Sequence, residues 1–298
     1  MNIKRWLLAL LLCVVPCLAL ADGSVINLIA EPDVPYAFEE GAKILEVVFP
    51  RTYSSDCAII RYDGETMMID GSLSSEKMQE RIRLALLAMQ VDHIDVAFNS
   101  HPHNDHIDGF PAIHQVAPIG KLLLTFPEDY NKNMVAVVAF MQENNVPIEH
   151  VSDGQVLTLG AQQEVTLNVM QRAGDKSFTI NDQSAMLLLT YGERTILFTG
   201  DVENRAQKSY ALDPPPCGLK ADILKYPHYG QVALLKGFYE AISPELTIMN
   251  GALDVMDGGK AFVKKKNLPY LFSVRGLTRM RTDGHIWVVD YLPEDVSL

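Results

Sequence analysis

The chain has 298 residues, of which 48% are hydrophobic, and it carries 25 lysines and arginines against 37 aspartates and glutamates. This length and composition suit one large globular domain or two small ones. The formal net charge of −12 argues against a general nucleic-acid coat protein, whose phosphate contacts need a basic surface. We therefore expect no stable nucleic-acid binding.

The first 21 residues have the pattern of a secretory leader. Lys4 and Arg5 precede a long apolar segment, which ends in the small-x-small cleavage pattern Ala19-Leu20-Ala21. We predict a signal peptide over residues 1–21, cleavage after Ala21, and a secreted or periplasmic mature protein without a transmembrane segment. An uncleaved membrane anchor is the alternative, although the apolar stretch is short for a spanning helix.

Hydrophobic patterning predicts strands and helices in alternation along residues 22–298, which we interpret as the functional domain. The predicted strands cover residues 44–49, 57–62, 66–69, 94–98, 121–126, 156–159, 165–170, 185–191, 195–198, 222–226, 246–249 and 286–289. The predicted helices cover residues 75–89, 133–144, 204–212 and 232–241. Strands followed by helices, twice over, predict an α/β (α+β) fold with two sheets face to face and helices outside.

The stretch from Ser100 to Gly109 reads Ser-His-Pro-His-Asn-Asp-His-Ile-Asp-Gly and follows an apolar predicted strand. Its ligand-type side chains at i, i+2, i+4 and i+5 are His101, His103, Asp105 and His106. Imidazole and carboxylate groups bind Zn²⁺, Mn²⁺ or iron, and groups at this spacing converge only if the backbone curls around an ion. The stretch predicts a metal-binding loop rather than a polar surface loop that happens to be rich in histidine.

Polar residues also end three other predicted strands, where strand ends can line one cleft. These residues are Asp70, Asp201 and His228. Asp201 could bridge two metals through its carboxylate, and His228 could add an imidazole nitrogen. Taken singly, each also fits a structural role: a turn residue, a helix cap and a partly buried histidine, respectively.

The order of these residues resembles the metallo-β-lactamase superfamily along essentially the whole mature chain. Further segments resemble, more narrowly, the extracytoplasmic hydrolase domain of the DNA-uptake competence proteins (ComEC type). These segments are Ser55 to Ile60, Asn181-x-x-Ser184, Phe198 to Asp201, Asp222 to His228 and Thr282-Asp283-Gly284. The resemblance implies a four-layer αββα sandwich, the metallo-β-lactamase fold, with a two-metal site at one edge.

The resemblance also implies a role for each site residue. His101 and His103 would hold one metal, and Asp201 would bridge to the second. The ligands of that second metal would be Asp105, His106 and His228. Asp70 would support the ligands or the metal loop from behind.

Two departures from the family pattern stand out. A third histidine for the first metal is missing between the loop and Asp201, where the chain offers only His114, eight residues past His106 and suited to packing, and His150, before a turn. The second departure is Tyr229, which stands where the competence-type branch has a second histidine, and Gln231 replaces its usual serine. We therefore expect the first metal site to be weak or completed by water.

The implied chemistry is metal-dependent hydrolysis. Two ions, zinc in the first instance with manganese or iron as alternatives, would generate a hydroxide nucleophile at neutral pH and stabilise charge on the substrate oxygen. Asp105 would orient this nucleophile or accept its proton, and Tyr229 would donate a hydrogen bond to the developing oxyanion.

A group of basic residues late in the acidic chain bears on the substrate. These residues are Lys260, Lys264, Lys265, Lys266, Arg275, Arg279 and Arg281. A solvated helix face with a following loop explains them, but folded over the site they would favour an anionic substrate. We predict a phosphodiesterase that acts on nucleic acid or on a phosphorylated envelope component. The substrate is therefore expected to be a phosphodiester or a small molecule. The alternatives are hydrolysis of a lactone or amide, including β-lactams, and a non-catalytic receptor that kept the pocket.

Overall fold

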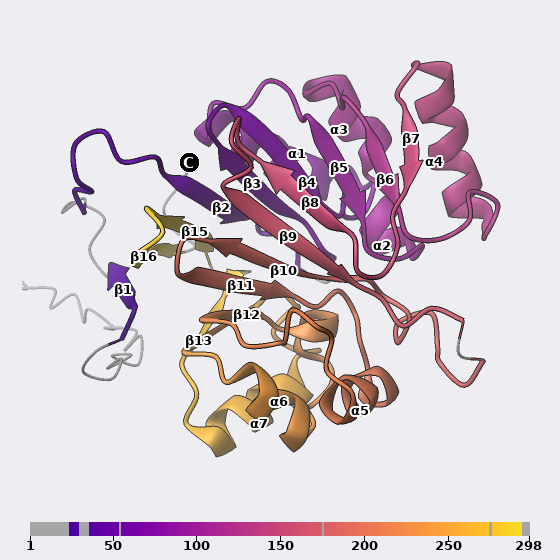
Figure 1. Ribbon diagram of the computed structural model, residues 1–298. Helices are drawn as coiled ribbons and strands as arrows, with labels where there is room; N and C mark the ends of the chain where they lie inside the picture. The colour runs from indigo at the N-terminus through magenta and orange to yellow at the C-terminus, as the bar shows by residue number, and fades with distance from the viewer. Residues whose placement is uncertain (1–23, 30–35, 54, 175, 274–275, 294–298) are drawn as a thin grey trace, which may run out of the picture.

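The computed structural model describes residues 24–29, 36–53, 55–174, 176–273 and 276–293. Two sheets lie face to face, and helices cover the outer face of each sheet (Figure 1). The predicted four-layer αββα fold is thereby confirmed. The predicted leader, residues 1–21, lies outside the described residues. Within the described part of the chain, no helix is both long enough and apolar enough to cross a membrane.

The first sheet has nine strands. In spatial order they are β1 (Ile26–Ile29), β16 (Trp287–Pro293), β15 (Gly276–Thr282), β2 (Leu45–Phe49), β3 (Ala58–Tyr62), β4 (Glu65–Ile69), β5 (Val96–Asn99), β6 (Leu122–Leu124) and β7 (Ile148–His150). The pairs from β4 to β7 are parallel, so these strands end at the same edge of the sheet.

The second sheet has seven strands. In spatial order they are β14 (Tyr270–Phe272), β13 (Leu246–Met249), β12 (Ile223–Lys225), β11 (Arg194–Phe198), β10 (Met186–Tyr191), β9 (Val165–Met170) and β8 (Val156–Leu159). Strands β11 to β14 are parallel to one another. The core between the sheets includes Phe49 and Phe198, whose rings are 6.1 Å apart.

Each sheet has its own group of helices on its outer face (Figure 1). The helices on the first sheet are α1 (Glu76–Ala88), α2 (Asn104–Ile107), α3 (Phe110–Val116) and α4 (Lys132–Glu143). Those on the second sheet are α5 (Asn204–Leu212), α6 (Lys236–Ile242) and α7 (Asp257–Lys266). Buried apolar side chains fill each interface: Ile82 and Met134 pack in the first, and Phe238 and Val263 in the second. A short 3-10 helix, η1 (Pro227–Gly230), follows β12.

Some element boundaries differ from the prediction. The helix predicted over residues 232–241 begins at Lys236. The two preceding backbone amides have tertiary partners: Leu234 N donates to Tyr226 Oη (3.2 Å) and Leu235 N to Gln207 Oε1 (2.8 Å). Strands β1, β7, β14 and β15 were not among the predicted elements, and helix α7 was expected only as the solvated helix face that carries the late lysines. Cys57 is buried, Cys217 is exposed, and both are free thiols, so the two do not form a disulfide.

Candidate metal centre

The candidate site lies where parallel strands of both sheets end. Asp70 follows β4, and the loop that begins at Ser100 follows β5 in the first sheet. Asp201 follows β11, and His228 lies in η1 after β12 in the second sheet. The backbone ties the two halves together, since Ala185 N donates to the carbonyl oxygen of Ser100 at 3.0 Å. The fold therefore brings residues more than a hundred positions apart to one edge.

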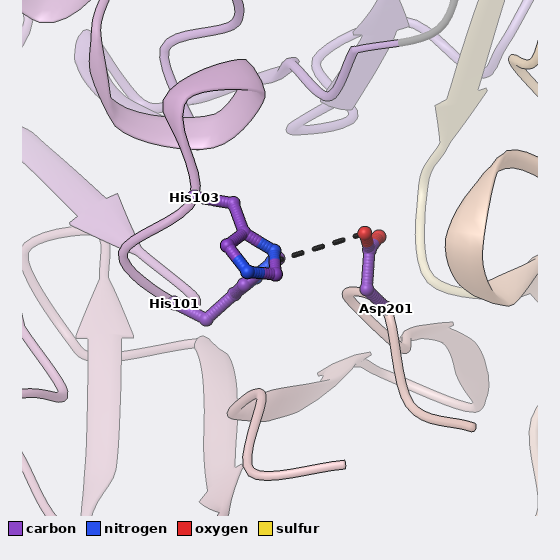
Figure 2. Close-up of side chains that lie close together, drawn as sticks. All are labelled: His101, His103 and Asp201. Carbon is purple, nitrogen blue, oxygen red and sulfur yellow. Dashed lines mark hydrogen bonds and ion pairs between the residues drawn. The ribbon is translucent and has the colours of Figure 1, made fainter. Parts of the chain in front are cut away.

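Three side chains form the centre of the site (Figure 2). The imidazole nitrogens His101 Nε2 and His103 Nδ1 are 3.0 Å apart, and His101 Nε2 is 3.8 Å from Asp201 Oδ2. One ligand atom from each of the three residues lies within 4.8 Å of the others. We call these residues, His101, His103 and Asp201, the triad.

The Asp201 carboxylate faces two further imidazoles. Its Oδ2 lies 3.3 Å from His106 Nε2 and 3.7 Å from His228 Nε2. Burial by itself would raise the pKa of Asp201, but the imidazoles of His106, His101 and His228 bring that pKa well below its usual range. The buried Asp201 Oδ1 has no hydrogen-bond partner among the described residues. A buried carboxylate oxygen of this kind is suited to a cation.

The triad fits a transition-metal ion. Burial lowers the pKa of His101 well below its ordinary value and also lowers that of His103. Both imidazoles are therefore neutral at neutral pH, the state in which histidine binds metals. Two neutral imidazoles and a carboxylate form a donor set that zinc, manganese and iron accept.

Asp70 holds the metal loop from behind. Its Oδ1 accepts a hydrogen bond from Ser100 N (2.7 Å), and its Oδ2 accepts one from Ser100 Oγ (2.7 Å). Asp70 Oδ2 also lies 2.8 Å from His106 Nδ1. Because a carboxylate only accepts, these contacts direct Nδ1 of His106 toward Asp70 and leave Nε2 for the site. Asp70 thus contacts both the start of the metal loop and His106, and its supporting role stays a prediction.

The two predicted catalytic residues, Asp105 and Tyr229, contact each other. The Tyr229 hydroxyl donates to Asp105 Oδ2 and lies 2.6 Å from His106 Nε2. Burial, with the nearby Asp201 and Asp105 carboxylates, raises the pKa of Tyr229 well above its ordinary value, so the phenol stays protonated at neutral pH. The sequence predicted a hydroxyl free to bind a substrate oxyanion, whereas the structure engages it with Asp105 and His106.

A second set of potential ligands does not fit an ion. Asp56, Asp70 and His106 also bring ligand atoms within 4.8 Å of one another. However, Asp56 already pairs with the Lys225 ammonium and accepts a hydrogen bond from Asn250 Nδ2 at 2.6 Å. These protein partners satisfy the carboxylates, so we interpret this set as a buried polar network beneath the site.

Glu203 is a site residue that the sequence interpretation missed. His228 Nδ1 lies 3.2 Å from Glu203 Oε1, at ion-pair distance although not in hydrogen-bond geometry. Glu203 in turn accepts a hydrogen bond from Asn181 Nδ2 at 3.0 Å. A carboxylate that accepts a hydrogen bond from a metal-binding histidine orients the opposite ring nitrogen toward the ion, and Glu203 lies where such a partner would be. Its sequence signal was weak, because Glu203 resembles an ordinary helix-cap residue before α5.

Replacing Glu203 by glutamine is expected to weaken metal binding by roughly 10-fold, since loss of such supporting partners costs about 10–100-fold in metal affinity or activity. Calorimetric zinc titration of the chelator-treated protein measures the effect. Glu80→Gln, at an exposed carboxylate on α1, is the matched control and should leave the affinity unchanged. Equal affinities for the two variants would contradict a positioning role for Glu203.

Gly200 shapes the turn that carries Asp201. Its φ of +48° lies in the left-handed region, and a Cβ there would approach the Ser184 Cβ to 2.9 Å. The carbonyl of Gly200 also accepts a hydrogen bond from His228 N at 3.1 Å. The turn thus fixes the Asp201 and His228 segments relative to each other.

Two histidines considered for the missing ligand take structural positions instead. His114 lies in α3, where its Nδ1 accepts a hydrogen bond from Ile119 N at 3.0 Å. His150 lies in the edge strand β7 with its side chain 50% exposed, and its Nε2 is 3.5 Å from Glu128 Oε1. His106 and His228, rather than either of these, surround the triad carboxylate.

Three of the late basic residues pair with nearby carboxylates. Arg279 and Arg281 on β15 both donate to Asp290 on the neighbouring strand, and Lys260 lies 2.9 Å from Asp257 within α7. Arg275 lies outside the described residues. These contacts agree with a solvated helix face and a paired strand, not with a basic rim folded over the site.

Residues 50–129 match the metallo-beta-lactamase superfamily, and this segment includes Asp70 and the whole metal loop. Over this segment, the chain is similar to the metallo-beta-lactamase superfamily. No curated protein matches the sequence.

Among solved structures, a mutant of the CmlA beta-hydroxylase aligns over 83% of this chain with 15% identity and a TM-score of 0.50. The chain spans only 54% of that protein's length. CmlA from Streptomyces venezuelae, a diiron beta-hydroxylase, gives 14% identity over 84% of this chain and 55% of its own, with a TM-score of 0.49. A diphosphatase of the PhnP family gives 14% identity over 74% of this chain and 82% of its own, with a TM-score of 0.41. At 15% identity, the likeness to the CmlA mutant concerns the fold alone.

Proposed function

We propose that the protein is a metal-dependent hydrolase whose catalytic cation is held by the triad, with His228 beside it. The observation that carries this proposal is the convergence of ligand atoms from His101, His103 and Asp201 within 4.8 Å. They come from two different sheets, and the third ligand's carboxylate keeps one buried oxygen unpartnered among the described residues. We propose zinc as the ion, with manganese and iron as alternatives that the same donors accept.

A bound cation would supply a Lewis acid for the substrate oxygen and a nucleophile from water at neutral pH. Some residues of the chain would bind the cation, and others would orient the residues that bind it. Asp70 and Ser100 fix the loop, and His101 is fully buried, whereas His103, Asp105 and His228 are only partly buried. We infer that substrate approaches from the side of these last three residues.

We propose a phosphodiester as the substrate, in preference to a lactone or amide. The cation would attract an anionic phosphoryl group and stabilise charge that develops on its oxygens. Support from the late basic residues is small, because Arg279 and Arg281 are engaged by Asp290. The preference therefore depends on the metal centre itself, and a substrate comparison tests it directly.

Zinc- or manganese-loaded protein is expected to hydrolyse bis-p-nitrophenyl phosphate with a higher kcat/KM than nitrocefin. Both reactions release coloured products, so one absorbance assay compares them, with chelator-treated protein as the blank. A higher kcat/KM for nitrocefin would contradict the phosphodiester assignment while keeping a metal-dependent hydrolase. No turnover of either compound by metal-loaded protein would favour the receptor alternative.

We further propose that the protein is exported. This proposal is based on the basic start, apolar segment and Ala19-Leu20-Ala21 pattern of the leader. Amino-terminal sequencing of the protein recovered from its host should give Asp22 as the first residue. An intact leader would favour the membrane-anchor alternative.

A further inference from the structure

The Tyr229 hydroxyl lies between two side chains that the family resemblance assigns to a second metal ion. It donates a hydrogen bond to Asp105 Oδ2 and lies 2.6 Å from His106 Nε2. Because His106 Nδ1 faces Asp70 at 2.8 Å, Nε2 is the only ring nitrogen that His106 could offer to an ion. The phenol oxygen therefore contacts one ligand atom of each side chain, Asp105 Oδ2 and His106 Nε2.

The backbone and the surrounding rings hold this phenol in place. Tyr229 is 1% exposed, and both it and His228 have left-handed φ values, 56° and 49°. The Tyr229 carbonyl accepts a hydrogen bond from Gly251 N at 3.0 Å. Its ring stacks on that of His106 with centroids 5.7 Å apart, and the Lys225 ammonium lies 5.6 Å from its centroid. A rotamer change that moved the hydroxyl away would disrupt these contacts.

The two halves of the site are therefore not equivalent. In the triad, His101 Nε2 and His103 Nδ1 face each other and Asp201, and Asp201 Oδ1 has no hydrogen-bond partner among the described residues. At the other half, the Tyr229 hydroxyl contacts both Asp105 and His106. An ion entering there would have to displace a buried hydroxyl together with both of its contacts.

We propose that the Tyr229 hydroxyl takes the place of the second metal ion, so that the centre holds a single ion at the triad. The inference rests on the proposed function, because it takes the triad to be a metal centre. In place of the expected two-ion site, the centre would hold one ion beside the contacting side chains of Asp105, Tyr229 and His106. In this arrangement Asp105 positions the phenol instead of ligating an ion.

Counting bound ions tests the proposal. The wild-type protein and the Tyr229→Phe and Tyr210→Phe variants are stripped with chelator, reloaded with excess zinc, desalted and analysed for zinc per chain. Tyr210 is the matched control, since it is also buried and its hydroxyl has no hydrogen-bond partner among the described residues. We expect one ion in wild type and in Tyr210→Phe, and a second, weaker ion in Tyr229→Phe.

Any other number of zinc ions per chain would contradict the proposal in a specific way. Two ions in wild type would overturn the single-ion proposal and leave the metal centre intact. No ion in wild type would overturn the metal centre and, with it, both proposals. One ion in Tyr229→Phe as well as in wild type would show that the hydroxyl does not block a second ion, and would also overturn the inference.

An ultraviolet difference spectrum provides a second readout on the wild-type chain. We expect zinc binding to leave the phenol neutral, with no phenolate signal. A metal-induced phenolate signal that disappears in Tyr229→Phe would instead identify Tyr229 as a ligand of the ion. That result would contradict the role of the hydroxyl as a substitute for a second ion.

Discussion

Asp201→Asn is expected to lower zinc affinity by more than about 100-fold and to abolish metal-dependent turnover. The substitution keeps the shape of the side chain but removes the only carboxylate of the triad, whose Oδ2 faces His101, His106 and His228. Loss of a hydrogen-bond partner of a metal ligand costs about 10–100-fold in metal affinity, so loss of the ligand itself should cost more. Calorimetric zinc titration and the bis-p-nitrophenyl phosphate assay measure the two effects.

The matched control is Asp257→Asn, which neutralises a carboxylate that is 85% exposed at the start of α7. It should leave affinity and turnover unchanged. If Asp201→Asn bound zinc as tightly as this control, Asp201 would not be a ligand.

Lys225→Met is expected to destabilise the fold by about 3–5 kcal/mol, because it leaves Asp56 as an uncompensated charge in the interior. Asp56 is 5% exposed and Lys225 3% exposed, and the two form an ion pair across the two halves of the sandwich. Burial raises the pKa of Asp56 and the Lys225 ammonium opposes that rise, so removing Lys225 also favours protonation of the carboxyl. The shift of the urea unfolding midpoint measures the loss.

The double variant Asp56→Asn/Lys225→Met supplies the control. It removes the buried charge and keeps an amide near Asn250, so it should lose less stability than Lys225→Met alone. If the single and double variants unfolded at the same denaturant concentration, the uncompensated charge would not be the cause. Because Asp56 N donates to the Asp105 carbonyl at 3.0 Å, Lys225→Met should also loosen the metal loop.

Local patterning predicted the central elements of the fold well. Helix α5 and strands β8, β9 and β13 have the predicted boundaries, because their apolar spacing and their end signals agree. Strand β15 was not predicted because it alternates buried Thr278 and Met280 with Arg279 and Arg281, which resembles a charged loop. Both arginines pair with Asp290 on the adjacent strand, a contact that no local pattern reveals.

The site residues that directly follow predicted strands could be selected from the sequence. The loop after β5, Asp201 after β11 and His228 after β12 meet because parallel strands of both sheets end at one edge. The Asp56–Lys225 pair was not predicted, since its partners are 169 positions apart. The position of the Tyr229 hydroxyl could not be predicted either, because it depends on two consecutive left-handed residues that only the folded backbone defines.

The central claim is that the triad is a metal centre, and calorimetric zinc titration of three chelator-treated proteins tests it most directly. The wild-type chain should bind zinc tightly, and His101→Ala should bind it more than about 100-fold more weakly, because the variant lacks a direct ligand. His150→Ala, at a half-exposed histidine outside the site, should match wild type. Equal zinc affinity for His101→Ala and wild type, or no binding by wild type, would contradict the claim.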